Sequence, residues 1–308
     1  MRSTTTSIHE GTTLGAITVG TSALGGNARR SATDELITAM AILRGPFPLV
    51  DTSNAYSGGR SEQILGRALA RLGDVPTSGI VTKVDRDPMT GALDRDRVLR
   101  SFEESLSRLG LERVGILHLH DPYTITLAEA AAPGGAIEGM LELRESGAVS
   151  AIGIAAGPIP LMRSYVETDA FDVLLTHNRY TLVDRSAELL LTEARSRRMT
   201  VFNAAPFGGG ILASGAPPGA TYGYRPASDN LISWVKSAER VCFDRGVSLP
   251  AAALHFSTRS PLVDSTVVGV SSQQRLQELD ELSRARIPDE LWSALAELGP
   301  APSAWEEE

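Results

Sequence analysis

The sequence predicts an α/β protein in which residues 1–308 form one domain, a (β/α)8 TIM barrel. Short runs of Val, Ile and Leu alternate along the chain with stretches of helical periodicity, a pattern typical of a parallel sheet covered by helices. No linker or break in composition divides the chain. The alternative, a doubly wound open sheet, is less favoured because no Gly-x-Gly-x-x-Gly follows any of the apolar runs.

The apolar runs predict the eight strands of this barrel. They are mostly continuous rather than alternating, as expected of strands that are buried on both faces. The predicted strands are 15–20, 47–51, 79–83, 114–120, 150–155, 171–176, 200–204 and 264–269.

The stretches between the runs predict helices. After Ser31, the side chains of Leu36, Met40 and Leu43 share one helical face. The other predicted helices are 64–72, 94–110, 136–147, 158–168, 185–198, 228–246 and 272–284. The longest irregular stretch, 208–228, is rich in Gly and Pro, and we expect it to be a functional loop.

Composition disfavours several classes of partner. A net charge of −8 and a pI near 5.3 provide no basic field for a nucleic acid. No apolar run approaches the roughly 20 residues that span a bilayer, and residues 1–13 lack the apolar core of a signal peptide. We therefore expect a cytoplasmic protein without a nucleic-acid or membrane partner. Cys242 is the only cysteine and is expected to be an inert buried thiol.

Four polar residues lie at or just after the carboxyl ends of predicted strands. Asp51 ends the second strand, Tyr56 follows in the next loop, Lys83 ends the third strand and His120 ends the fourth. Taken singly, each also has a structural interpretation, such as a capping Asp or a packed loop Tyr. In a barrel, however, polar residues at these strand ends face the active site. Because the three strands are neighbours, we expect the four side chains to lie together.

Together these side chains form a proton-transfer group. A tyrosine with an ordinary pKa of about 10 is a poor acid or base near neutral pH, so a neighbouring ammonium is needed to stabilise its phenolate. Lys83 can supply that charge, and Asp51 can keep the lysine protonated when it is desolvated. His120 can orient a substrate oxygen beside the tyrosine. His118 lies on the same side of its strand and is expected to be a core histidine with a hydrogen-bonded ring.

Three segments carry these residues: VDTSNAYSGGRSEQILGRAL (50–69), VTK (81–83) and LHLHDP (117–122). In this order and spacing they resemble the aldo-keto reductase superfamily, and the likeness covers nearly the whole chain. A closer likeness is to the branch of aldose and pyridoxal dehydrogenases. It rests on NRYTLVD (178–184), VFNAAPFGGGILASG (201–215), ATYGYRPA (220–227) and SLPAAALHF (248–256).

The resemblance implies a barrel that binds a nicotinamide cofactor without a Rossmann domain, with NADP(H) favoured and NAD(H) the alternative. It also implies that Tyr56 is the general acid/base, that Lys83 and Asp51 tune it, and that His120 orients a carbonyl or alcohol. Substrate contacts are expected at Tyr56, His120, Asp121 and Tyr123. Tyr222 and Tyr224 are further candidates, although each equally suits packing within its own loop.

The resemblance places the cofactor across the strand ends. Small residues after the seventh strand let backbone N–H groups approach a pyrophosphate, and the helix start after the eighth strand suits an adenosine phosphate. Cofactor contacts are expected at Gly20, Thr21, Asp51, His177, Ala205, Phe207, Gly208, Gly209, Gly269, Ser271, Ser272, Arg275 and Glu278. Arg275 has two interpretations, a contact to a 2′-phosphate or an i,i+3 surface pair with Glu278.

The resemblance is incomplete at positions that in many relatives hold the nicotinamide ring or the 2′-phosphate. These positions are Ala155, Ala156, His177, Ala204 and Gly269. The proton-transfer group itself is complete. The departures therefore concern the orientation of the cofactor and the preference for NADP(H) over NAD(H).

The predicted function is therefore NAD(P)-dependent oxidoreduction of a sugar or a similar small polar carbonyl. One alternative is a nicotinamide-binding barrel without catalysis. The presence of all four residues of the proton-transfer group disfavours it. The other is a metal-dependent hydrolase or isomerase, which needs clustered His and carboxylate ligands. The chain has five histidines, no His-Glu-x-x-His and no Gly-x-Ser-x-Gly, so no metal site is expected.

Overall fold

The computed structural model describes residues 14–26, 30–303 and 305 of the chain. Residues 1–13, on which the signal-peptide expectation rests, lie outside this part, as do the ends of the predicted domain 1–308.

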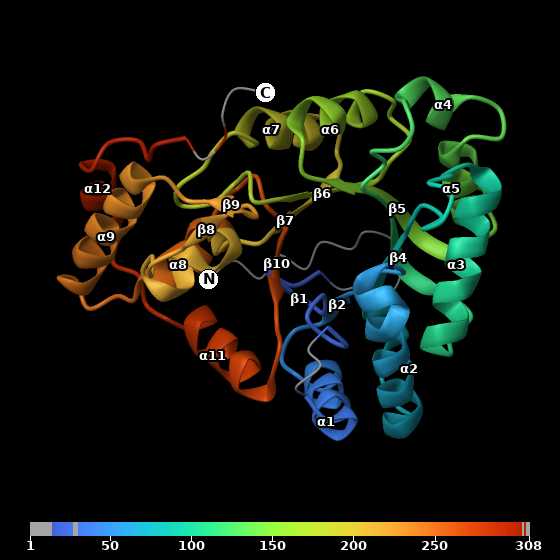
Figure 1. Ribbon diagram of the computed structural model, residues 1–308, viewed down its shortest axis with the longest axis horizontal. Helices are drawn as coiled ribbons and strands as arrows, with labels where there is room; N and C mark the ends of the chain where they lie inside the picture. The colour runs from blue at the N-terminus through green and yellow to red at the C-terminus, as the bar shows by residue number, and fades with distance from the viewer. Residues whose placement is uncertain (1–13, 27–29, 304, 306–308) are drawn as a thin grey trace.

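Eight parallel strands close into a barrel in the order β1-β10-β7-β6-β5-β4-β3-β2, with helices around it (Figure 1). The barrel strands are β1 (Ile17–Gly20), β2 (Leu49–Asp51), β3 (Ile80–Val84), β4 (Val114–His120), β5 (Val149–Ala156), β6 (Val173–His177), β7 (Thr200–Ala204) and β10 (Ser265–Gly269). Each overlaps a predicted strand, so the predicted (β/α)8 barrel is confirmed. A short antiparallel pair, β8 (Thr221–Tyr222) and β9 (Arg225–Pro226), lies within the predicted loop 208–228.

The predicted helices all have counterparts in the structure. They are α1 (Ala32–Leu43), α2 (Arg60–Leu72), α3 (Arg95–Leu109), α5 (Ala136–Glu145), α6 (Ile159–Val166), α7 (Glu188–Ser196), α9 (Asp229–Phe243) and α11 (Gln273–Ser283). The described part also contains α4 (Leu127–Ala131), α8 (Ile211–Ser214), α10 (Leu249–Thr258) and α12 (Asp289–Ala296), which periodicity did not predict. Helix α10 is buried on most of its surface, so it lacks the polar face that makes a helix visible in a sequence.

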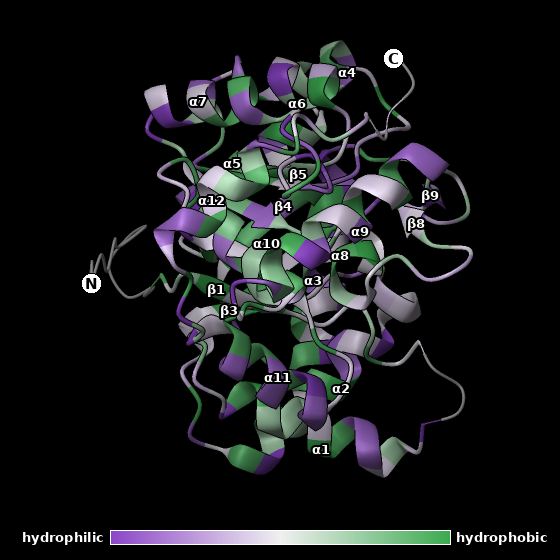
Figure 2. Ribbon diagram, turned by 90° about the vertical axis from the view of Figure 1, so that its left-hand side faces the viewer, coloured by the Kyte–Doolittle hydropathy of each residue, from purple (hydrophilic) through white to green (hydrophobic). Residues whose placement is uncertain are grey.

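The core has two layers, separated by the wall of the barrel. The inner layer fills the barrel and consists of Leu14, Leu49, Val81, Ile116, Ala151, Ala155, Val173, Leu175, Phe202 and Val267. A larger outer layer packs the other strand faces against the helices. In Figure 2 hydrophobic and hydrophilic residues alternate along many of the helices, as expected of helices with one face on the core. Cys242 belongs to the outer layer, and burial raises the pKa of its thiol to about 11, which fits an inert side chain.

Strand pairing brings the carboxyl ends of β2, β3 and β4 side by side. Asp51 pairs with Val81, and Lys83 pairs with His118. The predicted adjacency of the three strands is therefore correct, and their last residues meet at one mouth of the barrel.

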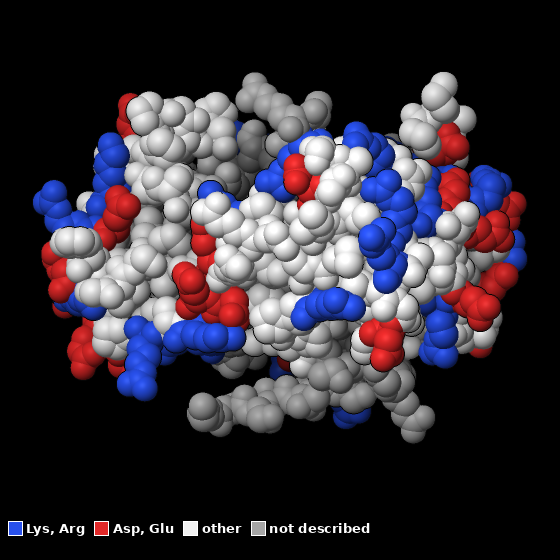
Figure 3. Space-filling model, turned by 90° about the horizontal axis from the view of Figure 1, so that it is seen from below, with Lys and Arg blue, Asp and Glu red and all other residues white. Residues whose placement is uncertain are grey.

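On the outer surface, acidic and basic side chains are intermingled over the face shown in Figure 3. None of the helices in the described part is both long and apolar enough to cross a membrane.

Candidate active site

A cavity of about 540 Å³ at the barrel mouth is lined by all four residues of the predicted proton-transfer group, Asp51, Tyr56, Lys83 and His120. The strand ends deliver three of them, and the loop after β2 returns Tyr56 over the opening. Larger hollows exist elsewhere on the molecule, but this one holds the clustered titratable groups on which a chemical reaction depends.

Asp51 and Lys83 form a buried ion pair at the floor of this cavity. The ammonium nitrogen Nζ lies 2.6 Å from Asp51 Oδ1 and 2.8 Å from Oδ2, and it donates a third hydrogen bond to the Thr52 carbonyl at 2.6 Å. Burial alone would lower the pKa of Lys83, but the charges of Asp51 and Tyr56 and the hydrogen bonding of the ammonium together outweigh it, so the net pKa is raised. The lysine therefore stays charged beside the tyrosine, as the sequence predicts.

Tyr56 lies against this charge. Lys83 Nζ is 4.7 Å from the centre of the tyrosine ring. Burial raises the pKa of the phenol to about 12, although the charge of Lys83 acts in the opposite direction. The expected stabilisation of the phenolate by Lys83 is thus present but smaller than the cost of desolvation, and the hydroxyl is protonated near neutral pH.

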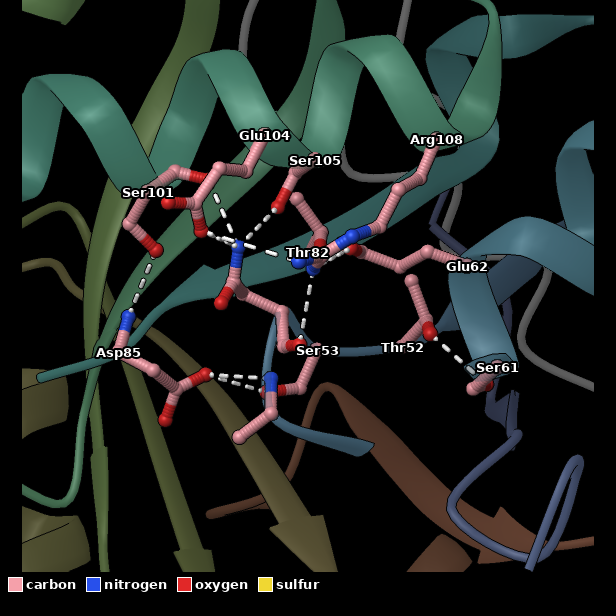
Figure 4. Close-up of polar contacts among 12 residues, drawn as sticks. Thr52, Ser53, Ser61, Glu62, Thr82, Asp85, Ser101, Glu104, Ser105 and Arg108 are labelled. Atoms are coloured by element: carbon pink, nitrogen blue, oxygen red, sulfur yellow. Dashed lines mark hydrogen bonds and ion pairs between the residues drawn. The ribbon is translucent and has the colours of Figure 1, made fainter. Parts of the chain in front are cut away.

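A polar network fixes the loop that carries Tyr56 (Figure 4). Asn54 donates from its backbone to the Lys83 carbonyl at 3.2 Å and from its side chain to Ser101 O and Glu104 Oε2, both at 3.0 Å. Immediately after the tyrosine, Ser57 has a left-handed backbone with φ of 54°. The loop is therefore held between β3 and α3 before it turns into α2.

The start of α2 is tied down in the same network. Glu62 is fully buried, accepts from Thr82 Oγ1 at 2.7 Å, and pairs with Arg108 at 3.2 Å (Figure 4). Burial raises the pKa of the Glu62 carboxyl, against the hydrogen bonds from Thr82 and Arg108. These contacts lock α2 onto β3 and α3, and so they fix the end of the tyrosine loop.

His120 stands across the cavity from the lysine. Its ring meets the Tyr56 ring edge to face at 6.0 Å between centres. Its Nε2 atom is 3.6 Å from Asp121 Oδ2, and its Nδ1 atom is 2.7 Å from Asp85 Oδ1. The histidine therefore presents Nε2 on the Asp121 side and Nδ1 toward a carboxylate that the sequence analysis did not single out.

That carboxylate, Asp85, and its partner Ser53 are the residues that sequence reasoning missed. Ser53 Oγ donates to Asp85 Oδ2 at 2.6 Å and lies 3.3 Å from His120 Nδ1. A signal was available, because Asp85 is two residues after Lys83 and strand side chains alternate with period two. Asp85 therefore continues the face of β3 that Lys83 occupies.

The prediction for His118 is partly wrong. The side chain is buried in the core as expected, and its ring packs edge to face on Phe202 at 6.2 Å. Neither ring nitrogen, however, has a hydrogen-bond partner among the described residues. Burial holds the pKa of His118 well below its ordinary value, so the ring is neutral. A β-carbon on Gly153 would lie 2.2 Å from its Nδ1, so the barrel has room for this ring only because glycine is there.

A second cavity of about 700 Å³ lies along α10 and α11 and shares the lining residue Gly269 with the mouth cavity. Its lining includes five predicted cofactor residues, Phe207, Gly269, Ser271, Arg275 and Glu278. A further three, Gly20, His177 and Ala205, line the mouth cavity together with Asp51. The lining of the second cavity includes Ser271 and Arg275 at the start of α11, and a helix N-terminus favours a bound phosphate.

The loop after β7 has a tightly turned backbone. Ala205, Gly208, Gly209 and Gly210 all have positive φ values, of 58°, 59°, 76° and 112°. The N–H groups of Ala205, Gly208 and Gly210 donate to the carbonyls of Val267, Ala205 and Phe207, so they are not free to bind an anion. A β-carbon on Gly208 would lie 2.4 Å from the Tyr222 ring, so glycine is required there. The contribution of this loop to a pyrophosphate site is therefore the space left by its small side chains.

Four predicted cofactor residues are not among those that line the two cavities: Thr21, Gly208, Gly209 and Ser272. The Thr21 hydroxyl donates to the Asp51 carbonyl at 2.9 Å, and Ser272 caps α11 through the Arg275 N–H at 3.2 Å. Arg275 forms the i,i+3 pair with Glu278 at 2.6 Å and is largely exposed. The guanidinium lies at the cavity wall within this pair. Its position therefore fits both predicted roles, a contact to a 2′-phosphate and a surface pair with Glu278.

The positions that depart from the family pattern surround the mouth. Ala155, His177 and Ala204 line it, whereas Ala156 packs in the outer core layer. Burial lowers the pKa of His177, so its ring is neutral. Asn178 Nδ2 can only donate, so His177 Nδ1 accepts at 3.2 Å and the ring proton is on Nε2.

The expected substrate residues lie at the rim. Asp121 has a left-handed backbone with φ of 44°, and its Oδ1 atom is buried without a hydrogen-bond partner among the described residues. Tyr123 is half exposed, and its hydroxyl accepts from the Gly157 N–H at 3.4 Å. Tyr224 lines the cavity, but Tyr222 is buried with its hydroxyl bonded to Thr181 and the Asn178 carbonyl, so it packs its own loop.

In the part of the chain that the structure describes, no group of three or more His, Cys, Asp or Glu side chains is placed to hold a metal ion.

Comparison with known proteins gives consistent matches. The sequence profile of the Aldo/keto reductase family matches residues 16–300. Pyridoxal 4-dehydrogenase from Microbacterium luteolum is 28% identical over 330 residues, covering 94% of this chain and 95% of that protein. L-galactose dehydrogenase from Arabidopsis thaliana is 31% identical over 279 residues, covering 88% and 84%. In fold, an aldo-keto reductase from Bacillus halodurans in its holo form is similar with a TM-score of 0.77, 19% identity and 94% coverage of both chains.

Proposed function

Because the chain belongs to the aldo/keto reductase family, we propose that it interconverts the carbonyl and alcohol forms of a sugar or a small sugar-like aldehyde. The predicted resemblance to the family is confirmed, and the protein is an NAD(P)-dependent oxidoreductase. The L-galactose dehydrogenase and pyridoxal 4-dehydrogenase relatives support a small polar substrate.

One observation carries the proposal for the site. The protonated Tyr56 hydroxyl belongs to a side chain that contacts both the Lys83 ammonium, 4.7 Å from its ring centre, and the His120 ring, 6.0 Å away. An acid placed beside a buried cation and an orienting histidine is suited to give a proton to a carbonyl oxygen.

In the reducing direction, Tyr56 donates its proton to the substrate oxygen while the carbonyl carbon gains a hydride. A bound nicotinamide supplies that hydride, or accepts it during oxidation. Lys83, held by Asp51, stabilises the phenolate that remains on Tyr56 after the transfer. His120 orients the oxygen of the alcohol form. In the oxidising direction, Tyr56 takes the proton back.

The cofactor is proposed to extend from the mouth cavity to the second cavity past Gly269, which lines both. Gly20, His177 and Ala205 would contact its nicotinamide end, and Ser271 and Arg275 its adenosine end. The Nε2–H of His177 is a donor that suits the carboxamide oxygen of a nicotinamide. We propose NADP(H) as the favoured cofactor because a guanidinium pairs well with a 2′-phosphate, with NAD(H) as the alternative.

The substrate is proposed to contact Asp121 and Tyr123 besides Tyr56 and His120. An unpartnered carboxylate oxygen at Asp121 is a good acceptor for a sugar hydroxyl. We also propose that the full chain, 1–308, acts as one domain and works in the cytoplasm.

The function is tested by titrating the purified protein with NADPH and NADH and then screening aldoses and simple aldehydes for cofactor-dependent turnover. The expected result is tight binding of one cofactor and oxidation or reduction of at least one polyhydroxylated substrate. Binding without any turnover would instead support a non-catalytic nicotinamide-binding barrel. Activity that follows the content of a bound metal, and is lost with a chelator, would support the hydrolase or isomerase alternative.

A further inference from the structure

We propose that Asp85 is a positioning residue that holds the ring proton of His120 on Nδ1, so that Nε2 offers its lone pair to the substrate oxygen. The proposal rests on the proposed function, because it concerns how the same site holds the alcohol and carbonyl forms of its substrate. It assigns to this chain a Ser53–Asp85–His120 chain of hydrogen bonds behind the catalytic cluster.

The contact between Asp85 and His120 is direct. Asp85 Oδ1 lies 2.7 Å from His120 Nδ1, a length typical of a charge-assisted hydrogen bond. The two side chains are largely buried, with 12% and 15% of their surfaces exposed, so water competes little for either group.

Asp85 is itself held in place from several sides. Its second oxygen, Oδ2, accepts from Ser53 Oγ at 2.6 Å and from the Ala55 N–H at 3.0 Å. Figure 4 shows Ser53 and Asp85 facing each other. Ser101 Oγ accepts from the Asp85 N–H at 3.0 Å, and Arg97 Nε donates to the Asp85 carbonyl at 2.9 Å. With Oδ2 occupied and the backbone anchored, Oδ1 is directed at the histidine.

The carboxyl group is ionised in this setting. Burial raises the pKa of Asp85, but the net pKa lies below the ordinary value, because His120, Ser53 and the Ala55 N–H donate hydrogen bonds to the carboxylate and a protonated His120 adds an attractive charge. An ionised carboxylate only accepts hydrogen bonds. His120 Nδ1 must therefore carry the proton of this contact.

The consequence appears at the other ring nitrogen. A neutral imidazole has one N–H, so a proton on Nδ1 leaves Nε2 as an acceptor. An alcohol can donate its hydroxyl proton to that lone pair, whereas a carbonyl oxygen has no proton to give. A His120 ring with its one proton on Nδ1 is thus set to hold the alcohol form, and the protonated Tyr56 hydroxyl is the donor that remains for the carbonyl form.

The variant Asp85→Asn tests this by reversing the polarity of one contact. The amide oxygen of asparagine still accepts from Ser53 and the Ala55 N–H, so the anchoring of the side chain is preserved. Its amide nitrogen can only donate, so His120 Nδ1 becomes an acceptor and the ring proton moves to Nε2.

The tautomer is measured by NMR on the full-length protein with 15N-labelled histidine and added oxidised cofactor, at a pH where histidine is ordinarily neutral. The His120 signals are assigned by their loss in His120→Gln. We expect a protonated Nδ1 in the wild type and a protonated Nε2 in Asp85→Asn. Asp96→Asn is the matched control, because Asp96 is 69% exposed in a surface pair with Arg95, and it should give the wild-type tautomer.

Kinetics provide a second readout. In Asp85→Asn, the KM for the alcohol should rise by about three- to tenfold, the effect of one lost hydrogen bond, while the KM for the carbonyl should not rise. A structural role alone would change both KM values together.

Two results would overturn the proposal: an Nε2–H tautomer in the wild type, or His120 signals that do not change in Asp85→Asn. If Asp85→Asn does not fold, the wild-type spectrum alone shows whether the ring proton is on Nδ1. Ser53→Ala leaves the carboxylate in place and should keep the wild-type tautomer. The NMR result does not depend on turnover, so a failed aldose screen would count against the proposed function alone.

Discussion

The ammonium of Lys83 on β3 lies 2.6 Å from Asp51 Oδ1 on β2, and the two side chains are only 2% and 3% exposed. Burying such a pair costs desolvation free energy. Removing one partner destabilises the protein further, because the partner that remains is an uncompensated buried charge. The pair therefore links the stability of the barrel to the electrostatics of Tyr56.

Asp51→Asn should lower the free energy of unfolding by about 3–5 kcal/mol, the usual cost of breaking a buried pair. Lys83→Met should do the same, and the double variant should lose clearly less than the sum of the two. Urea denaturation of the four proteins measures this coupling. Additive losses would show that the two charges do not stabilise each other.

The protonation of Tyr56 can be titrated directly. Because burial raises the pKa of its phenol to about 12, the folded protein keeps this proton at pH 10, where an unperturbed tyrosine is half ionised. Phenolate absorbance at pH 10 should therefore be equal in the wild type and in Tyr56→Phe, without added cofactor. A larger signal in the wild type would mean that Lys83 outweighs desolvation.

Arg275 should decide between the two cofactors. If its guanidinium contacts a 2′-phosphate, Arg275→Ala should weaken NADPH binding by roughly ten- to a hundredfold, the value of a hydrogen bond to a charged group, and leave NADH binding nearly unchanged. Glu278→Gln removes its partner at 2.6 Å and should not weaken NADPH binding. Equal losses for both cofactors in Arg275→Ala would assign the arginine to the surface pair.

Asp121 should recognise a substrate hydroxyl. Its buried Oδ1 has no hydrogen-bond partner among the described residues, so a sugar hydroxyl would satisfy it. Asp121→Asn should raise the KM for an aldose by about tenfold and leave the KM for a simple aldehyde without hydroxyl groups unchanged. Asparagine tolerates the left-handed backbone at this position, which keeps the loop intact. A parallel change for both substrates would point to His120 instead, 3.6 Å away.

The sequence predicted the barrel because its strands are continuous apolar runs, and it predicted the clustering of Asp51, Tyr56, Lys83 and His120 because parallel strand ends share one mouth. The functional roles of these residues are still predictions. Helix α10 escaped detection because burial on most of its surface removes the amphipathic period.

The remaining differences arise from tertiary contacts. Whether the pKa of Tyr56 is raised or lowered depends on the balance between desolvation and the charge of Lys83. The spacing of residues in the sequence does not reveal that balance. The ring of His118 is without hydrogen bonds among the described residues because apolar neighbours such as Phe202 surround it. The period-two spacing of Lys83 and Asp85 could have indicated that both face the same side. The contact of Asp85 with His120, however, depends on the pairing of β3 with β4.

The most direct test of the account is the turnover of Tyr56→Phe with NADP(H) or NAD(H) and the best substrate of the screen. We expect kcat to fall by at least about a hundredfold, the lower range for a lost general acid, while cofactor affinity and folding are retained. Tyr165→Phe is the matched control, since that hydroxyl is buried in α6 away from the mouth and has no hydrogen-bond partner in the described part. It should keep wild-type turnover. Retention of most turnover in Tyr56→Phe would contradict the proposed mechanism.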